Sequence, residues 1–319
     1  MDEISEKVRL GKSNLEITTL GFGAWAIGSR GYGEVPDQKA RKALQTYLDA
    51  GGNFIDTATR YGNSEEIIGR VLEKDTYSRP EVIIASKTPE LEPDKIREEV
   101  EESLKRLRTD YVDLYYLHAP PEDKDTMNRI LDEFMKLKEE GKILSIGASI
   151  KGPNVTEKTV KLCQQYIKTE KVDVLQVIFS IFRQKNRDMF DLADSYDVGI
   201  VGRTALESGF LTGKYRPGYR FSEDDHRKRW GQSKLDNILQ IVKNLEEEFV
   251  QPPYDQLSEV AVKFALDEAG IDSVIVGAKN RKQVQANIRA TNLPSLTKEK
   301  RIKLVEEFSG REEEFNTVQ

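Results

Sequence analysis

The chain has 319 residues, 38% of them hydrophobic, and its formal net charge is -6 at pH 7. This length fits one large barrel or two smaller domains, because barrels of alternating strands and helices reach ~250 residues as one unit. One cysteine, Cys163, and two histidines exclude an intrachain disulfide and a Cys/His zinc site, and the acidic balance calls for no nucleic-acid partner.

Residues 1–10 are rich in charge and contain no apolar core, unlike a signal peptide. No apolar run elsewhere approaches the ~20 residues that a membrane-spanning helix needs. We therefore expect a soluble, cytoplasmic protein without a membrane partner.

The predicted elements begin with a hairpin over residues 8–19, which turns at 12–14 and is placed to plug the bottom of a barrel. Eight apolar, β-rich segments follow, at 18–23, 53–56, 82–87, 111–117, 143–149, 173–178, 199–205 and 273–278. Amphipathic helical segments alternate with them, at 37–50, 64–74, 93–107, 125–140, 155–169, 185–196, 255–269 and 280–289. Eight such units predict an α/β fold of the (β/α)8 TIM-barrel class, as a single domain over residues 1–319.

Three extra segments interrupt this regular pattern. A polar loop at 216–231 and a helix at 233–249 separate the last two strands, and a final helix is expected at 297–314. Long irregular loops in compact domains are often functional lids. A doubly wound dinucleotide-binding sheet is the main alternative fold, but it requires G-x-G-x-x-G after the first strand. Here Gly21 and Gly23 are followed by Ala26 at the third glycine position, which disfavours that fold.

Four proton-handling side chains stand at or just after the ends of successive strands. The peptides NFIDTATRYG (53–62), VIIASK (82–87) and DLYYLHAP (113–120) carry Asp56, Tyr61, Lys87 and His118. Because a buried charge is costly unless it is paired, we expect these strand ends to meet around one pocket. The alternative is an ordinary buried Asp–Lys pair with an unrelated tyrosine and histidine.

The chemistry that this set favours is proton donation to a carbonyl oxygen. An ordinary phenol, with a pKa of about 10, is a poor acid at neutral pH, but a neighbouring ammonium favours its ionisation. Lys87 would supply that ammonium to Tyr61, and Asp56 would supply the countercharge that a buried lysine needs. His118 would hydrogen-bond and orient the substrate oxygen.

These peptides, with Gly147-x-Ser149, Gln176 and LESGFLTGKY (206–215), closely resemble the aldo-keto reductases in the family's order along the whole chain. The resemblance implies a (β/α)8 barrel that reduces aldehydes or ketones with NADP(H), or with NAD(H) in some members. Its catalytic tetrad falls on Asp56, Tyr61, Lys87 and His118. The Arg-Thr-Ala-Leu segment at 203–206 resembles a bacterial branch of the family that carries arginine at this strand end.

The same resemblance assigns a cofactor site. Ser149 and Gln176 match residues that bind the nicotinamide amide, whereas Ile150 replaces an asparagine. Arg203 stands where the family stacks an aromatic ring on the nicotinamide, and a planar guanidinium can stack similarly or reach the amide oxygen. The expected cofactor-binding residues are Gly23, Ala24, Trp25, Ser149, Gln176, Arg203, Thr204, Leu206, Ser208, Gly209, Leu211, Gly213, Lys214, Gly277, Lys279, Gln283 and Asn287.

The phosphate end of this site favours NADPH over NADH. Gly209 and Gly213 permit close backbone approach to a pyrophosphate, and Lys214 adds positive charge. Lys279 begins a Lys/Arg cluster at the start of the last barrel helix, where amides suit an anion. The alternative is a solvated, charged helix start.

Two other functions remain as rivals. A channel-associated redox sensor would keep the fold but turn over very slowly, which an intact tetrad argues against. A barrel aldolase would use Lys87 as a Schiff base, although a cationic lysine paired with aspartate is a poor nucleophile. In the long loop, Trp230 and His226 are expected to pin the loop rather than to touch a ligand.

Overall fold

The computed structural model describes every residue except 1, 30–32, 74–76, 153, 224 and 318–319. Eight parallel strands form a closed barrel in chain order, and the last strand pairs with the first. They are β3 (Leu20–Gly23), β4 (Phe54–Asp56), β5 (Ile83–Thr88), β6 (Val112–His118), β7 (Ile143–Ser149), β8 (Val174–Ile178), β9 (Gly199–Arg203) and β10 (Ser273–Gly277). The predicted TIM barrel is therefore confirmed, with all eight strands in the expected places.

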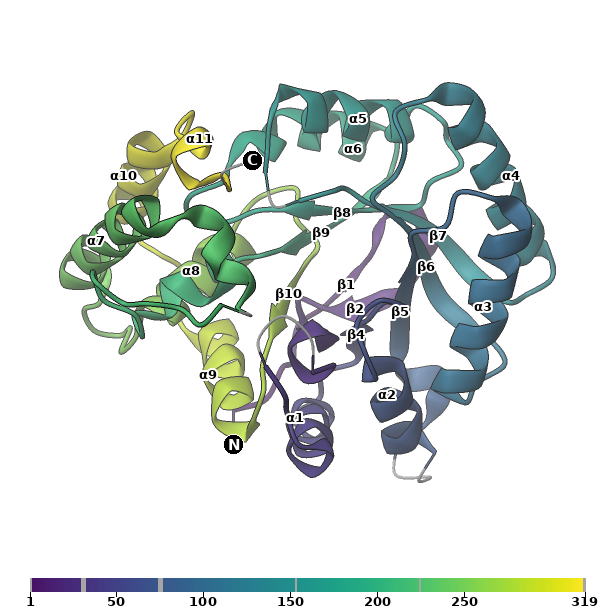
Figure 1. Ribbon diagram of the computed structural model, residues 1–319, viewed down its shortest axis with the longest axis horizontal. Coiled ribbons are helices and arrows are strands. Elements are labelled where there is room, and N and C mark those ends of the chain that lie inside the picture. The colour runs from purple at the N-terminus through teal and green to yellow at the C-terminus, as the bar shows by residue number, and fades with distance from the viewer. Residues whose placement is uncertain (1, 30–32, 74–76, 153, 224, 318–319) are drawn as a thin grey trace.

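Helices surround the barrel and follow its strands (Figure 1). They are α1 (Asp37–Asp49), α2 (Ser64–Leu72), α3 (Pro93–Leu107), α4 (Lys124–Glu139), α5 (Glu157–Ile167), α6 (Phe190–Ser195), α8 (Leu257–Leu266) and α9 (Arg281–Asn292). In α4 the buried residues Ile130, Leu131, Phe134 and Leu137 recur every three or four positions, so one stripe faces the strands. The expected helix at 64–74 ends at Leu72, and residue 74 lies outside the described part.

An antiparallel hairpin closes the bottom of the barrel, as predicted. It consists of β1 (Lys7–Arg9) and β2 (Glu16–Thr18), joined across a short 3-10 helix at Gly11–Ser13. Leu10 and Ile17 are fully buried and pack with residues inside the barrel, including Phe54 and Val174. The hairpin therefore supplies the lowest layer of the interior core.

The remaining helices gather at one side of the barrel, around α8 (Figure 1). They are α7 (Gln232–Phe249), α10 (Lys298–Phe308) and α11 (Glu312–Phe315). The expected single helix at 297–314 is thus two helices. Gly310 has φ +79°, a left-handed conformation that ends an α-helix, and Ser309 is already extended. This break turns the chain back toward the barrel rim.

Candidate active site

Three strand ends and one loop bring the four predicted catalytic side chains together. Asp56 ends β4, Lys87 lies near the end of β5, His118 ends β6, and Tyr61 follows β4 in a short loop. The Lys87 ammonium donates to Asp56 Oδ1 at 2.6 Å and to the Tyr61 hydroxyl at 3.5 Å. The side chains of Lys87 and Asp56 are 0% and 1% exposed, so this is a fully buried ion pair. The expected pocket of converging strand ends is present.

The loop that carries Tyr61 is held by a close contact with the segment that follows β3. A Cβ atom placed on Gly28 would lie 1.8 Å from the Tyr61 carbonyl oxygen, so only glycine fits there. Below the tyrosine, the hydroxyls of Thr57 and Ser64 share a 2.6 Å hydrogen bond that closes the loop onto α2. These contacts fix the backbone from which the phenol projects.

His118 faces the tyrosine as a neutral imidazole. Its ring stands edge-on to the Tyr61 ring, with centroids 5.9 Å apart. Burial, together with the positive charges of Lys87, Arg203 and Arg60, lowers the pKa of His118 to about 3. The side chain therefore stays uncharged at neutral pH and can donate or accept a hydrogen bond, but it carries no charge of its own.

Asp56 is bound on both of its oxygens. Lys87 occupies Oδ1, and Gln176 Nε2 donates to Oδ2 at 2.6 Å. Ser149 Oγ in turn donates to Gln176 Oε1 at 3.0 Å. Two residues expected to bind the nicotinamide amide are thus also part of a chain of hydrogen bonds that ends on the Asp56 carboxylate.

A cleft of about 950 Å³ opens at the carboxyl ends of the strands and runs outward to the start of α9. It is large enough for an extended dinucleotide. Fourteen of the predicted residues line it: Gly23, Trp25, Asp56, Tyr61, Arg203, Thr204, Leu206, Ser208, Gly209, Lys214, Gly277, Lys279, Gln283 and Asn287.

Five predicted cofactor residues lie outside the lining of the cleft, and two of them, Ser149 and Gln176, belong to the chain of hydrogen bonds that ends on Asp56. Ala24 and Leu211 are fully buried in the core. Gly213 faces α7, where an added Cβ would lie 2.7 Å from Glu246 Oε1. Family position alone cannot separate these residues from their neighbours that face the cleft.

Arg203 extends from the end of β9 toward the loop that follows β7. Its Nη2 donates to the Ile150 carbonyl at 2.7 Å, and its Nη1 donates to Thr204 Oγ1 at 3.3 Å. Gly152 permits this close approach, because a Cβ there would lie 2.9 Å from Arg203 Nη2. Burial lowers the pKa of Arg203, while Tyr61 and Asp56 oppose the shift. Ile150, which replaces the asparagine of the family pattern, thus binds Arg203 through its backbone carbonyl.

Positive charge collects at the outer end of the cleft. Lys214, Arg227, Lys279 and Lys282 line it, and burial together with the cations of Arg227 and Lys214 lowers the pKa of Lys279. Asn280 caps α9 by accepting from the Gln283 amide at 3.1 Å. A site of this charge suits a phosphate group.

A model of the Aldo/keto reductase family matches residues 19–308 of the chain. The chain belongs to the aldo/keto reductase family. The uncharacterized oxidoreductase YqkF of Bacillus subtilis (strain 168) is 30% identical over 307 residues, which are 92% of this chain and 93% of that protein. The NADH-specific methylglyoxal reductase of Escherichia coli (strain K12) is 29% identical over 320 residues, with coverages of 90% and 94%. The structure of aldo-keto reductase AKR11C1 from Bacillus halodurans (holo form) superposes with a TM-score of 0.76 at 26% identity, over 96% of this chain and 97% of that one.

Aldo/keto reductases reduce carbonyl compounds with nicotinamide cofactors, so this chain is an oxidoreductase that acts on small molecules. Over the residues that the structure describes, no group of three or more His, Cys, Asp or Glu side chains could hold a metal ion. In the same residues, no helix is long and apolar enough to cross a membrane.

The sequence analysis missed Arg227 in the long loop of this reductase. Arg227 lines the cleft, donates to the Tyr215 hydroxyl at 2.8 Å and to Asp225 Oδ2 at 2.6 Å, and lies over the Phe221 ring. His226, which was expected only to pin the loop, has its ring 5.1 Å from that of Trp25. The sequence signal for Arg227 was the cluster of basic residues at 226–229, and such a cluster is also typical of an ordinary solvated loop.

Proposed function

We propose that the protein is an NADP(H)-dependent reductase of aldehydes or ketones, with Tyr61 as the proton donor. The observation that carries this proposal is the buried Lys87 ammonium, which bonds Asp56 on one side and the Tyr61 hydroxyl on the other. A cation at that distance is placed to stabilise negative charge that develops on the phenol oxygen as the proton is transferred. The aldolase accounts for this arrangement less well, whereas the redox sensor is distinguished from a reductase by its rate of turnover.

The residues of the cleft fit a nicotinamide dinucleotide. Tyr61 and Arg203 stand at its inner end and the cations around Lys279 at its outer end. At the inner end, the planar guanidinium of Arg203 is placed to stack on a ring or to reach an amide oxygen. When bound, a nicotinamide cofactor supplies the hydride that adds to the carbonyl carbon of the substrate.

The proton that the carbonyl oxygen needs comes from Tyr61. Lys87 stabilises the phenolate that remains, and Asp56 keeps the lysine charged in its buried site. His118 remains neutral, so it hydrogen-bonds the substrate oxygen without competing as an acid. Its Nδ1 atom is buried and has no hydrogen-bond partner among the described residues, which leaves bonding capacity for a ligand or a water.

An aldolase that uses Lys87 as a Schiff base is disfavoured by the same geometry. The ammonium donates to Asp56, to the Thr57 carbonyl and to Tyr61, so all three of its hydrogens have acceptors. A nucleophilic lysine must be neutral. Borohydride in the presence of a carbonyl substrate should therefore trap no adduct on Lys87.

Replacing Tyr61 with phenylalanine tests the proton donor. We expect turnover of an aldehyde panel to fall by about 10²- to 10⁴-fold, because positioned proton transfer is lost. NADPH should still quench tryptophan fluorescence, since the cleft is retained. The matched control is Tyr115→Phe, which removes a buried hydroxyl bonded to Ser103 on α3 and should leave turnover nearly unchanged. Full turnover by Tyr61→Phe would refute the role, and failure of the wild type to reduce any carbonyl would favour the redox sensor.

The choice between NADPH and NADH is tested through Lys279. Loss of a charge-assisted bond to the 2′-phosphate should raise the Michaelis constant for NADPH by about tenfold or more in Lys279→Ala. The constant for NADH should hardly change, because NADH lacks that phosphate. Lys300→Ala on α10, far from the cleft lining, is the control. Equal constants for the two cofactors, unaffected by Lys279→Ala, would contradict the preference.

A further inference from the structure

The turn at residues 204–213, which we call the rim turn, is strained where it lines the cleft. Thr204, Glu207 and Ser208 have φ values of +69°, +48° and +55°, although none of them is glycine. Such a backbone conformation is unfavourable for a residue with a side chain and persists only where its surroundings hold it in place. Thr204 and Ser208 line the cleft, so whatever holds the rim turn also shapes the proposed cofactor site.

A buried ion pair holds this turn. Glu207 Oε2 accepts from Arg183 Nε at 3.1 Å, and Oε1 accepts from Ser180 Oγ at 2.5 Å. The Arg183 and Glu207 side chains are 1% and 2% exposed. Arg183 Nη1 is buried and has no hydrogen-bond partner within the described part of the chain. Such a pair is weak evidence of net stabilisation, because the desolvation of both charges is costly.

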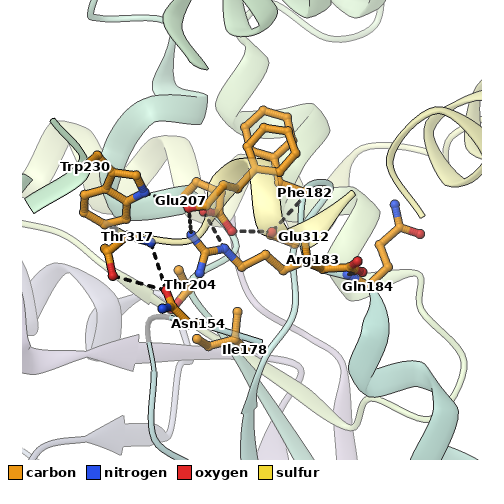
Figure 2. Close-up of polar contacts among 12 residues, drawn as sticks. Asn154, Ile178, Phe182, Arg183, Gln184, Thr204, Glu207, Trp230, Glu312 and Thr317 are labelled. Atoms are coloured by element: carbon orange, nitrogen blue, oxygen red, sulfur yellow. Dashed lines mark hydrogen bonds and ion pairs between the residues drawn. The ribbon is translucent and has the colours of Figure 1, made fainter. Parts of the chain in front are cut away.

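The other end of Arg183 binds the C-terminal segment, which we define as residues 312–317. Arg183 Nη2 donates to the Phe315 carbonyl at 2.7 Å, and Trp230 Nε1 donates to the same oxygen at 2.7 Å. The Phe182 and Phe315 rings stack with centroids 4.0 Å apart. One guanidinium therefore connects the rim turn to the C-terminal segment, beside Trp230 at the end of the long loop (Figure 2).

The C-terminal segment also reaches the loop that follows β7. The Thr317 amide donates to Asn154 Oδ1 at 2.9 Å, a contact that Figure 2 shows. On the opposite side, Glu312 Oε1 accepts from the Gln184 amide at 3.2 Å. Residues from three separate rim segments, at 154, 182–184 and 230, thus meet on the six residues of the C-terminal segment.

We propose that Arg183 is a positioning residue that couples the C-terminal segment to the rim turn, so that docking of this segment sets the affinity and release rate of the cofactor. The inference rests on the proposed function, which places a nicotinamide dinucleotide in this cleft. The coupling is reciprocal, so bound cofactor must also tighten the C-terminal segment. The strained rim turn is the element that both of them bias.

The matched pair of variants is Arg183→Gln and Arg106→Gln in the full-length chain. Arg106 forms a group with the same pattern of bonds, since the buried Glu65 accepts from Arg106 Nε at 2.7 Å and from Ser86 Oγ at 2.6 Å. The Arg106 side chain is 28% exposed, and neither Arg106 nor Glu65 lines the cleft. Both variants should lower the melting temperature. Only Arg183→Gln should also speed NADPH dissociation in stopped-flow fluorescence, by about fivefold or more.

Hydrogen exchange distinguishes coupling through Arg183 from a purely structural role of this residue. NADP should slow amide exchange of the C-terminal peptide in the wild type and in Arg106→Gln, and should not slow it in Arg183→Gln. Equal dissociation rates and equal protection in the two variants would overturn the inference. If the wild type bound neither NADPH nor NADH, the proposed function itself would fail instead.

Trp230→Phe decides the matter if Arg183→Gln does not fold. This change keeps an aromatic ring in the core, removes the Nε1 donor to the Phe315 carbonyl and gives up part of the buried indole packing. We expect NADPH to dissociate about two- to fivefold faster, with cofactor protection of the C-terminal peptide reduced. An unchanged rate together with unchanged protection would overturn the coupling.

Discussion

Lys87 and His118 illustrate how burial assigns proton chemistry to single residues. The lysine is buried with all three hydrogens bonded, whereas the histidine is kept uncharged by burial and by neighbouring cations. The sequence was sufficient to predict these two residues and Asp56, because each ends an apolar run, and the family motif that follows Asp56 predicted Tyr61. It did not predict Arg183 or its contacts, because those partners lie far apart in the chain and meet only in the folded protein.

The depressed pKa of His118 predicts an acid-sensitive stability. Between its folded value of about 3 and its ordinary value of 6.5, the unfolded histidine binds a proton that the folded one does not. Above pH 6.5, His118 therefore does not reduce the free energy of unfolding. As the pH falls from 6.5 toward 3, the free energy of unfolding decreases. From pH 7.5 to 5.0, urea unfolding should show that the wild type loses up to about 2 kcal/mol more than His118→Gln does. Parallel losses in the two proteins would contradict the prediction.

At the start of alternate barrel strands, a side-chain oxygen accepts a hydrogen bond from a backbone amide. Asn53, Asp113, Asp173 and Asp272 stand at the starts of β4, β6, β8 and β10. Each accepts a backbone amide from the preceding segment, from Thr18, Ile84, Ile146 and Ile200 respectively, at 2.7–2.9 Å. Apolar runs were enough to predict the strands, but not this recurring acceptor, because isolated carboxylates before strands resemble ordinary loop residues. The final helix was mispredicted for a related reason, since its charged pattern continues past Gly310.

Asp173 offers the clearest test of these side-chain acceptors. Its Oδ2 accepts from the buried Ile146 amide at 2.8 Å. Asp173→Ala leaves that amide without an acceptor, so we expect the free energy of unfolding to fall by about 1–3 kcal/mol in urea titrations. Asp173→Asn should cost less, because its amide oxygen still accepts. Asp188→Ala, at an exposed ion pair, is the control. An asparagine variant as damaged as the alanine variant would show that the charge, rather than the acceptor, is needed.

At the scale of the whole molecule, the barrel supplies a rigid rim and the chain's end reinforces it. The proposed tetrad lies at the ends of β4–β6 and in the loop after β4, whereas the proposed phosphate end of the cleft lies after β9 and β10. The alternation of strands and helices predicted this division into two halves. The coupling of the C-terminal segment to the rim could not be predicted, because it depends on where the chain turns after Gly310.

Transfer of a labelled hydride tests the central claim most directly. The reductase should be incubated with an aldehyde and with NADPH that carries deuterium at the reactive carbon of the nicotinamide, and the alcohol should be analysed by mass spectrometry. We predict deuterium on the carbinol carbon of the product with the wild type, and about 10²- to 10⁴-fold less product in the same time with Tyr61→Phe. An alcohol without deuterium, or equal labelled product from Tyr61→Phe, would contradict direct hydride transfer with Tyr61 as the acid.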